Sequence, residues 1–126
     1  MVERLKQVFC TALSENNIDL RDTKNFAEVF PQVFLRTSNI KRIYYQGVSA
    51  INVSFTLDLF SKYSGEKEIL DLEQEISTIA RNLVDTNDFI MGMGLRSCLI
   101  QDDDSTGINI KHGILIYDFV LAEVLE

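Results

Sequence analysis

Nine consecutive residues, from Ile51 to Leu59, alternate strictly between apolar and polar side chains. Successive side chains of a β-strand point to opposite faces, so a period of two in branched and aromatic residues predicts a strand. One face of this strand belongs in a core and the other faces water or a neighbour, which is typical of an antiparallel sheet covered on one side. The apolar face consists of Ile51, Val53, Phe55, Leu57 and Leu59.

Two other segments follow the helical period. In residues 2–16, apolar side chains recur every three or four positions, and Asn16 and Asn17 are suited to end the helix. Residues 66–85 show the same spacing, with acidic residues in the first turn, where they suit the positive end of the helix dipole. The apolar stripe of this second helix consists of Ile69, Leu72, Ile76, Ile79 and Leu83.

Strand patterns also occur before and after these elements. QVFLR follows the Phe30-Pro31 bond, and later alternations span residues 89–100 and 108–116. The ending IYDFVLAEVLE is apolar on both sides, as in a central strand or in one whose second face meets another subunit. The order α-β-β-α-β-β predicts an α+β fold, with an antiparallel sheet of four to five strands packed with two helices. No internal repeat or linker is evident, so we expect residues 1–126 to form a single domain.

The charge balance narrows the range of partners. The formal net charge is −7, and Lys41-Arg42 are the only adjacent pair among 12 basic residues, whereas binding to a phosphate backbone needs clustered Lys and Arg. No apolar run reaches the roughly 18 residues of a membrane span, and the N-terminus lacks the apolar region of a signal peptide. Two isolated cysteines make no disulfide framework, which favours a reducing compartment.

Residues 101–112, QDDDSTGINIKH, contain three consecutive aspartates between two apolar stretches. As an EF-hand calcium loop starting at Asp102, the stretch places Gly107 at position 6 but Gly113 where the bidentate glutamate belongs. The flanking patterns also indicate strands and not helices. We therefore predict a polar β-hairpin loop, with Gly107 free to adopt positive φ, and no metal site.

One pair of residues offers nucleophilic chemistry. If the hairpin is centred near Ser105, Cys98 lies opposite His112. In such a pair the cysteine would be the nucleophile and the histidine the base. No orienting carboxylate, oxyanion loop or third metal ligand accompanies the pair in the sequence. The carboxylates of the second helix fit a solvated face, and no phosphate-binding glycine motif is present. The sequence favours a binding or assembly module without catalytic, cofactor or metal residues over an enzyme.

Several segments together are similar to a known family. The strand that begins FPQVFLRTS, the long strand in INVSFTLDLFSKYSGEKEIL, the amphipathic helix and the closing antiparallel pair resemble the tail terminator (tail completion) proteins of long-tailed bacteriophages. In that family the strand typically runs into an aromatic/Ser/Lys stretch and a Gly-Glu helix start, which here is DLFSKYSGE, residues 58–66. The likeness covers nearly the whole chain.

The resemblance implies a structural role in the virion tail, after assembly in the host cytoplasm, without a cofactor or a membrane. Members of the family form a ring, usually a hexamer, that caps the tail tube, fixes its length and presents a surface to the head. The implied partners are other copies of the chain, the tail tube protein and the head-tail connector protein. DNA would only pass through the lumen, since an acidic lining would not hold it.

Two segments are candidates for ring or tube contacts. Exposed Tyr and Arg suit protein interfaces, so KRIYYQGVSA (residues 41–50) is one candidate, although an ordinary hairpin with Tyr45 in the core explains it equally well. The acidic loop is the other, as a charged tip at a subunit or lumen surface. The candidate interface residues are Lys41, Arg42, Tyr44, Tyr45, Gln46, Asp102, Asp103 and Asp104.

Three other functions stay open on the sequence alone. The chain fits another head-tail connector or minor tail or capsid component, which would also assemble with other proteins. A small cytoplasmic enzyme that uses Cys98 and His112 would show a reactive thiol. A small-molecule-binding or regulatory α+β domain would respond to a ligand.

Overall fold

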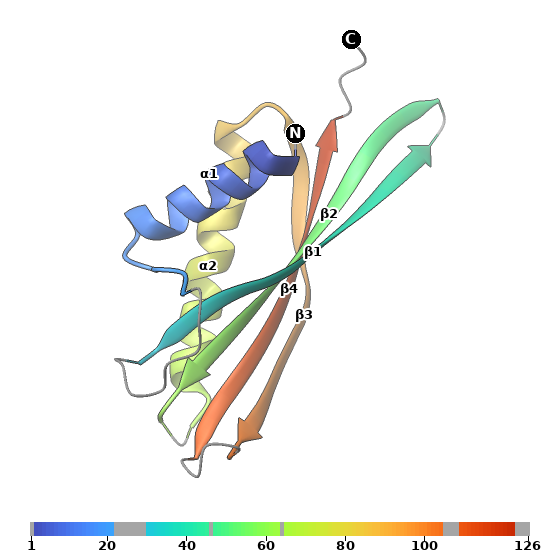
Figure 1. Cartoon of the computed structure of the whole chain (residues 1–126). Coiled ribbons are helices and arrows are strands. Elements are labelled where there is room, and N and C mark those ends of the chain that lie inside the picture. The colour runs from blue at the N-terminus through green and yellow to red at the C-terminus, as the bar shows by residue number, and fades with distance from the viewer. Residues whose placement is uncertain (1, 22–29, 46, 64, 105–108, 123–126) are drawn as a thin grey trace.

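The chain folds into two layers, a four-stranded antiparallel sheet and a pair of helices that lie on one of its faces (Figure 1). The computed structural model describes residues 2–21, 30–45, 47–63, 65–104 and 109–122, and within these ranges all side chains except those of residues 37, 38, 45 and 48. The predicted α+β class, with helices packed on an antiparallel sheet, is confirmed.

The elements follow in the order α1 (Val2–Glu15), β1 (Gln32–Tyr45), β2 (Val48–Ser61), α2 (Lys67–Thr86), β3 (Ile90–Asp103) and β4 (Ile110–Ala122). Across the sheet the order is β1-β2-β4-β3, so β2 and β4 are central and β1 and β3 are edges. The segment IYDFVLA lies in β4, and its central position explains why it is apolar on both sides. β1 is longer than predicted, because QVFLR and residues 41–45 join in one strand of 14 residues.

The asparagines end α1 as predicted. Asn17 adopts the left-handed conformation, with φ 63°, which is a common way for a helix to finish. The Ile18 N–H then donates to the Leu13 carbonyl at 2.9 Å, so the last turn keeps a partner for one of its carbonyl groups.

The main core lies between the helices and the face of the sheet that they cover. The alternating apolar residues 53–59 of β2 are fully buried there, which confirms the strand predicted from the alternation. From α1, the ring centroid of Phe9 lies 5.7 Å from that of Phe55 and 5.4 Å from that of Phe119. Burial of each such side chain contributes about 1.5–3 kcal/mol. Other fully buried core residues are Leu5, Leu13, Ile69, Ile76, Ala80, Leu115, Tyr117 and Leu121.

Each edge strand contains a β-bulge at an arginine. The pairing of β1 with β2 shifts register between Leu35 and Thr37, and the pairing of β3 with β4 shifts between Leu95 and Ser97. The residue between each pair has no partner opposite it, as in a bulge. The apolar pattern of the sequence predicts neither bulge.

The two bulges make equivalent ion pairs. Arg36 Nε lies 2.8 Å from Asp58 Oδ2, and Arg96 Nε lies 3.2 Å from Asp118 Oδ2. The arginines are 60 positions apart (36 to 96), and so are the aspartates (58 to 118). The element order thus repeats in two αββ halves, α1-β1-β2 and α2-β3-β4, although no internal repeat is evident in the sequence.

Candidate functional site

The first candidate site is the outer part of the β1–β2 hairpin, residues 39–45 and 47–50, called the arm below. The arm projects beyond the helices at the end of the sheet where β2 stops pairing with β4 (Figure 1). Gly47 forms its turn with φ 79°, a conformation that glycine adopts at least cost. Because neither α1 nor α2 covers the arm, large apolar side chains stay in solvent: Ile40 is 56% exposed, Ile43 36% and Tyr44 73%.

Strand alternation divides the side chains of the arm between its two faces. Ile40 lies opposite a core residue of β2, so Ile40, Arg42 and Tyr44 belong to the face of the sheet that carries the helices. Lys41 and Ile43 belong to the other face. The arm therefore continues the core-facing pattern of β1 beyond the point where the core ends.

The predicted interface residues of the first segment lie on this arm. Lys41, Arg42 and Tyr44 are exposed, and they lie on a strand rather than in a loop. The side chain of Tyr45 falls outside the described residues, so the choice between an interface and a core position for it stays untested. The whole of Gln46 also falls outside them.

The three predicted acidic interface residues lie at the opposite end of the sheet. Residues 102 and 103 end β3 and residue 104 follows them, so the loop begins later than expected. Across the β3–β4 pair, the Asp102 carboxylate lies 2.6 Å from Lys111 Nζ. Residues 105–108, which include Gly107, fall outside the described ranges. The structure therefore separates the two predicted interface sets instead of joining them.

The structure does not pair Cys98 with His112, as a hairpin centred near Ser105 would have done. Cys98 pairs with Leu115, three positions from the expected partner, and His112 pairs with Gln101. An odd slip in register reverses the face on which a side chain lies, so the thiol and the imidazole lie on opposite faces of the sheet. Partial burial, and then the carboxylates of Glu73 and Glu66, raise the pKa of the Cys98 thiol, which lowers its thiolate fraction.

His112 instead belongs to a polar cluster on the face without helices. Its Nε2 lies 2.7 Å from Asp58 Oδ1, while the other carboxylate oxygen of Asp58 binds Arg36. The imidazole stacks on Phe60, with ring centroids 4.4 Å apart. A small apolar cluster, formed by Phe34, Phe60 and Ile110 with Phe30, adjoins it. The polar cluster joins β1, β2 and β4, so its contacts cross-link the sheet.

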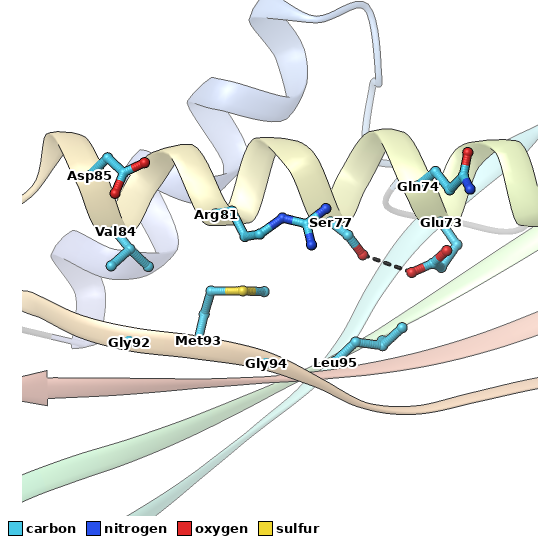
Figure 2. A pocket seen from close by; sticks show the side chains of 10 residues that line it. All are labelled: Glu73, Gln74, Ser77, Arg81, Val84, Asp85, Gly92, Met93, Gly94 and Leu95. Carbon is cyan, nitrogen blue, oxygen red and sulfur yellow. Dashed lines mark hydrogen bonds between the residues drawn. The ribbon is translucent and has the colours of Figure 1, made fainter.

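The second candidate site is a pocket of about 690 Å³ between α2 and the edge strand β3 (Figure 2). Met93 and Leu95 point from β3 toward the helix and give the pocket an apolar floor. The α2 wall is polar, because four lining side chains follow one another at intervals of four residues: Glu73, Ser77, Arg81 and Asp85. This series is visible in the sequence, but the assignment of the acidic helix residues to a solvated face missed the pocket.

A hydrogen-bonded chain ties the pocket wall to β4. The Ser77 hydroxyl donates to Glu73 Oε1 at 2.8 Å, and the Tyr117 hydroxyl lies 2.8 Å from Ser77 Oγ. Because the Ser77 proton is used toward Glu73, Tyr117 is the donor to Ser77. Burial of the Tyr117 phenol raises its pKa well above the ordinary value, so the hydroxyl stays protonated and keeps donating.

Comparisons of the chain with models of known protein families and with curated proteins found no match. In the part of the chain that the structure describes, no three His, Cys, Asp or Glu residues gather as a metal site requires. Likewise, no helix among the described residues is long and apolar enough to cross a membrane. The features that bear on function are therefore the arm, the pocket and the resemblance of the sequence.

Proposed function

We propose that this chain is a structural protein of a phage virion, a tail terminator. It assembles as a homohexameric ring on the end of the tail tube, caps the tube and offers the head-tail connector its joining surface. The observation that carries the proposal is the arm, whose exposed Ile40, Ile43 and Tyr44 are not covered by α1 or α2. The resemblance of the sequence supplies the family, and the arm supplies a means of assembly.

The arm has the chemistry of a contact surface. A two-stranded ribbon is marginally stable in water unless its apolar face is covered, and this one carries Ile40, Arg42 and Tyr44 on its helix-side face. Tyr and Arg are enriched in protein interfaces, where they supply most of the binding free energy. Large apolar side chains gathered on a projecting hairpin mark an interaction site. Assembly with other subunits would give the arm the cover that its own helices do not provide.

The charge of the chain suits a ring through which DNA passes. The net charge is −7, so the field of a ring of six copies would repel the phosphate backbone and keep it from adhering to the lumen. A structural role also agrees with the outcome for Cys98 and His112, which lie on opposite faces of the sheet.

Tube capping tests the proposal directly. The purified protein is added to tail tubes of the encoding phage, and tube ends are viewed by negative-stain electron microscopy while tube elongation is followed by light scattering. We expect ring-shaped caps on one end of each tube and an arrest of elongation. Tubes that stay uncapped and elongate at the same rate would disprove the proposal. Binding to the connector protein without tube capping would assign the chain to the connector side instead.

A further inference from the structure

We infer that the arm of one copy docks into the pocket between α2 and β3 of a second copy, and that this contact joins neighbours in the ring. The inference rests on the proposed self-assembling function and goes further, because it assigns a particular surface on each side of the subunit contact. The pocket is otherwise an open hollow of about 690 Å³ beside an edge strand.

The positions of the two surfaces favour a ring. The arm includes the edge strand β1, whereas the pocket borders β3 at the other edge of the sheet. A contact between two different surfaces is heterologous, and heterologous contacts close into rings when the rotation between copies allows it. A contact of arm with arm would instead give a closed dimer.

The chemistry of the two surfaces is complementary. On the arm, Ile40, Arg42 and Tyr44 share the face of the sheet that carries the helices. In the pocket, Met93 and Leu95 offer apolar surface to Ile40 and Tyr44. The α2 wall offers carboxylates to Arg42, a guanidinium that binds carboxylates through several N–H groups at once.

The charge of α2 supports the same pairing. The helix contains five carboxylates and two cations, a net charge of −3, and two of these carboxylates, Glu73 and Asp85, line the pocket with one cation, Arg81, between them. The arm contains Lys41-Arg42, the only adjacent basic pair of the chain. Opposite charge between the two surfaces steers association and sets its orientation.

The pocket is also accessible to an arm. Its volume lies within the range of about 300–1,000 Å³ that accommodates whole small ligands, so an aromatic side chain with its neighbours fits. β3 has no neighbouring strand on its outer side, so an approaching hairpin meets no strand that it would have to displace. Gly92 and Gly94 add no side chains to this stretch of the edge, and a Cβ at either position would meet nothing within 4 Å.

Disulfide cross-linking between two single-cysteine proteins tests the contact. In a background with Cys10→Ser and Cys98→Ser, one protein has Tyr44→Cys and the other, with a tag of different mass, has Asp85→Cys. We expect the mixture to form a mixed disulfide dimer at least tenfold faster than either protein forms dimers with itself. Tyr44→Cys dimers as the main product would show an arm-to-arm contact and overturn the inference. So would the absence of any mixed dimer.

Charge reversal gives a second test. Arg42→Glu alone and Asp85→Arg alone should each raise the concentration for half-assembly at least tenfold in mass photometry, and the double variant should recover most of the loss. Lys6→Glu on α1 is the matched control for added negative charge, and circular dichroism checks folding. If both single variants assemble like the wild type, the inference is wrong. Should those variants still cap tubes, the proposed function survives; a wild type that leaves tubes uncapped removes the proposed function itself.

Discussion

At the scale of single residues, the sheet and α2 approach each other closely at Gly113 of β4. A Cβ added there would come within 2.6 Å of Ile69 Cγ2 on α2. That methyl group belongs to a buried β-branched residue, for which one χ1 rotamer is strongly preferred in a helix, so turning it away costs free energy. We expect Gly113→Ala to lower the free energy of unfolding by about 1–3 kcal/mol, as overpacking does elsewhere.

Urea unfolding measures this loss, and two variants make the cause specific. Gly92→Ala is the matched control, because its Cβ would meet nothing within 4 Å, and its effect should stay within about 0.5 kcal/mol. Ile69→Leu removes the γ-methyl group, so Gly113→Ala combined with Ile69→Leu should be more stable than the sum of the two single effects predicts. Strict additivity would show that the two side chains do not clash.

A second residue, Tyr117, should make the free energy of unfolding fall at alkaline pH. Burial raises the pKa of its phenol above the ordinary value of 10.0. The folded protein therefore keeps this proton at a pH where the unfolded chain loses it, so the contribution of Tyr117 is complete below pH 10 and declines as pH rises above it. The decline approaches about 1.4 kcal/mol per pH unit for one such group.

Tyr117→Phe tests this pH dependence. At pH 7 we expect a loss of about 1 kcal/mol, because one net hydrogen bond to Ser77 disappears. Between pH 9 and pH 11 the variant should lose stability less steeply than the wild type. Tyr63→Phe, at a residue that is 67% exposed, is the control and should keep the wild-type slope. Parallel slopes for wild type and Tyr117→Phe would contradict the assignment.

At the scale of elements, the sequence predicts best where one period runs without interruption. Residues 51–59 and the stripe of α2 face a single core, so their patterns gave both element and buried face. The β3–β4 pairing was predicted wrongly because the turn was placed near Ser105. Residues 98–103 pair without a shift with residues 110–115, so each partner lies three residues further along β4 than that turn gives. Beyond Cys98, β3 also contains register shifts between Leu95 and Ser97 and between Ile90 and Gly92. Each shift reverses the face of the residues beyond it, and the apolar pattern has no signal for either.

The arm could be predicted from the sequence better than the pocket, because the arm has a local sequence signal and the pocket does not. Exposed Tyr and Arg beside a glycine turn are a local signal, so Lys41, Arg42 and Tyr44 could be named as candidates from the sequence, and the structure places them on an exposed strand. The pocket depends on how α2 sits above β3, which is a tertiary arrangement. Only its spacing of four residues from Glu73 to Asp85 was visible in the sequence.

The arm should separate folding from assembly. Tyr44 is 73% exposed, so Tyr44→Ala should leave the free energy of unfolding of the monomer within about 0.5 kcal/mol of the wild type. The same change should raise the concentration for half-assembly at least tenfold, since a tyrosine at the centre of an interface contributes about 2 kcal/mol or more. Thermal unfolding of dilute protein and mass photometry of concentrated protein give the two values. Tyr63→Ala, at a similarly exposed tyrosine, should change neither.

At the scale of the whole molecule, the strands of the two halves, β1-β2 and β3-β4, are arranged about a local two-fold axis. Thr56 of β2 pairs with Ile116 of β4, and these positions are also 60 residues apart. The axis therefore passes between the two central strands, which places one half on each side of it. The Arg–Asp bridges repeat across this axis, whereas the arm belongs to the first half and the pocket to the second. The two halves thus end in two different edges of the sheet, as a heterologous ring contact requires.

The two bridges should differ in strength, because their surroundings have diverged. The Asp58 side chain is 8% exposed and contacts both Arg36 and His112, whereas the Asp118 side chain is 27% exposed and contacts Arg96 and the Ser54 hydroxyl. When a buried carboxylate is removed, its cationic and hydrogen-bonding partners are left unpaired, which destabilises the folded protein. At a more exposed site water can take the place of the carboxylate, so the loss of stability is smaller. We therefore expect Asp58→Asn to cost about 2–3 kcal/mol and Asp118→Asn about 1 kcal/mol.

Chemical unfolding of both variants, with Arg36→Gln and Arg96→Gln completing two double-mutant cycles, measures each coupling separately. The coupling of Asp58 with Arg36 should exceed that of Asp118 with Arg96 by at least twofold, and 0.5 M NaCl should weaken the second pair more than the first, since salt screens exposed pairs more strongly. Equal couplings with equal salt dependence would mean that the halves still carry equivalent bridges. In that case the asymmetry of the molecule would lie only in its edges, where the arm and the pocket are.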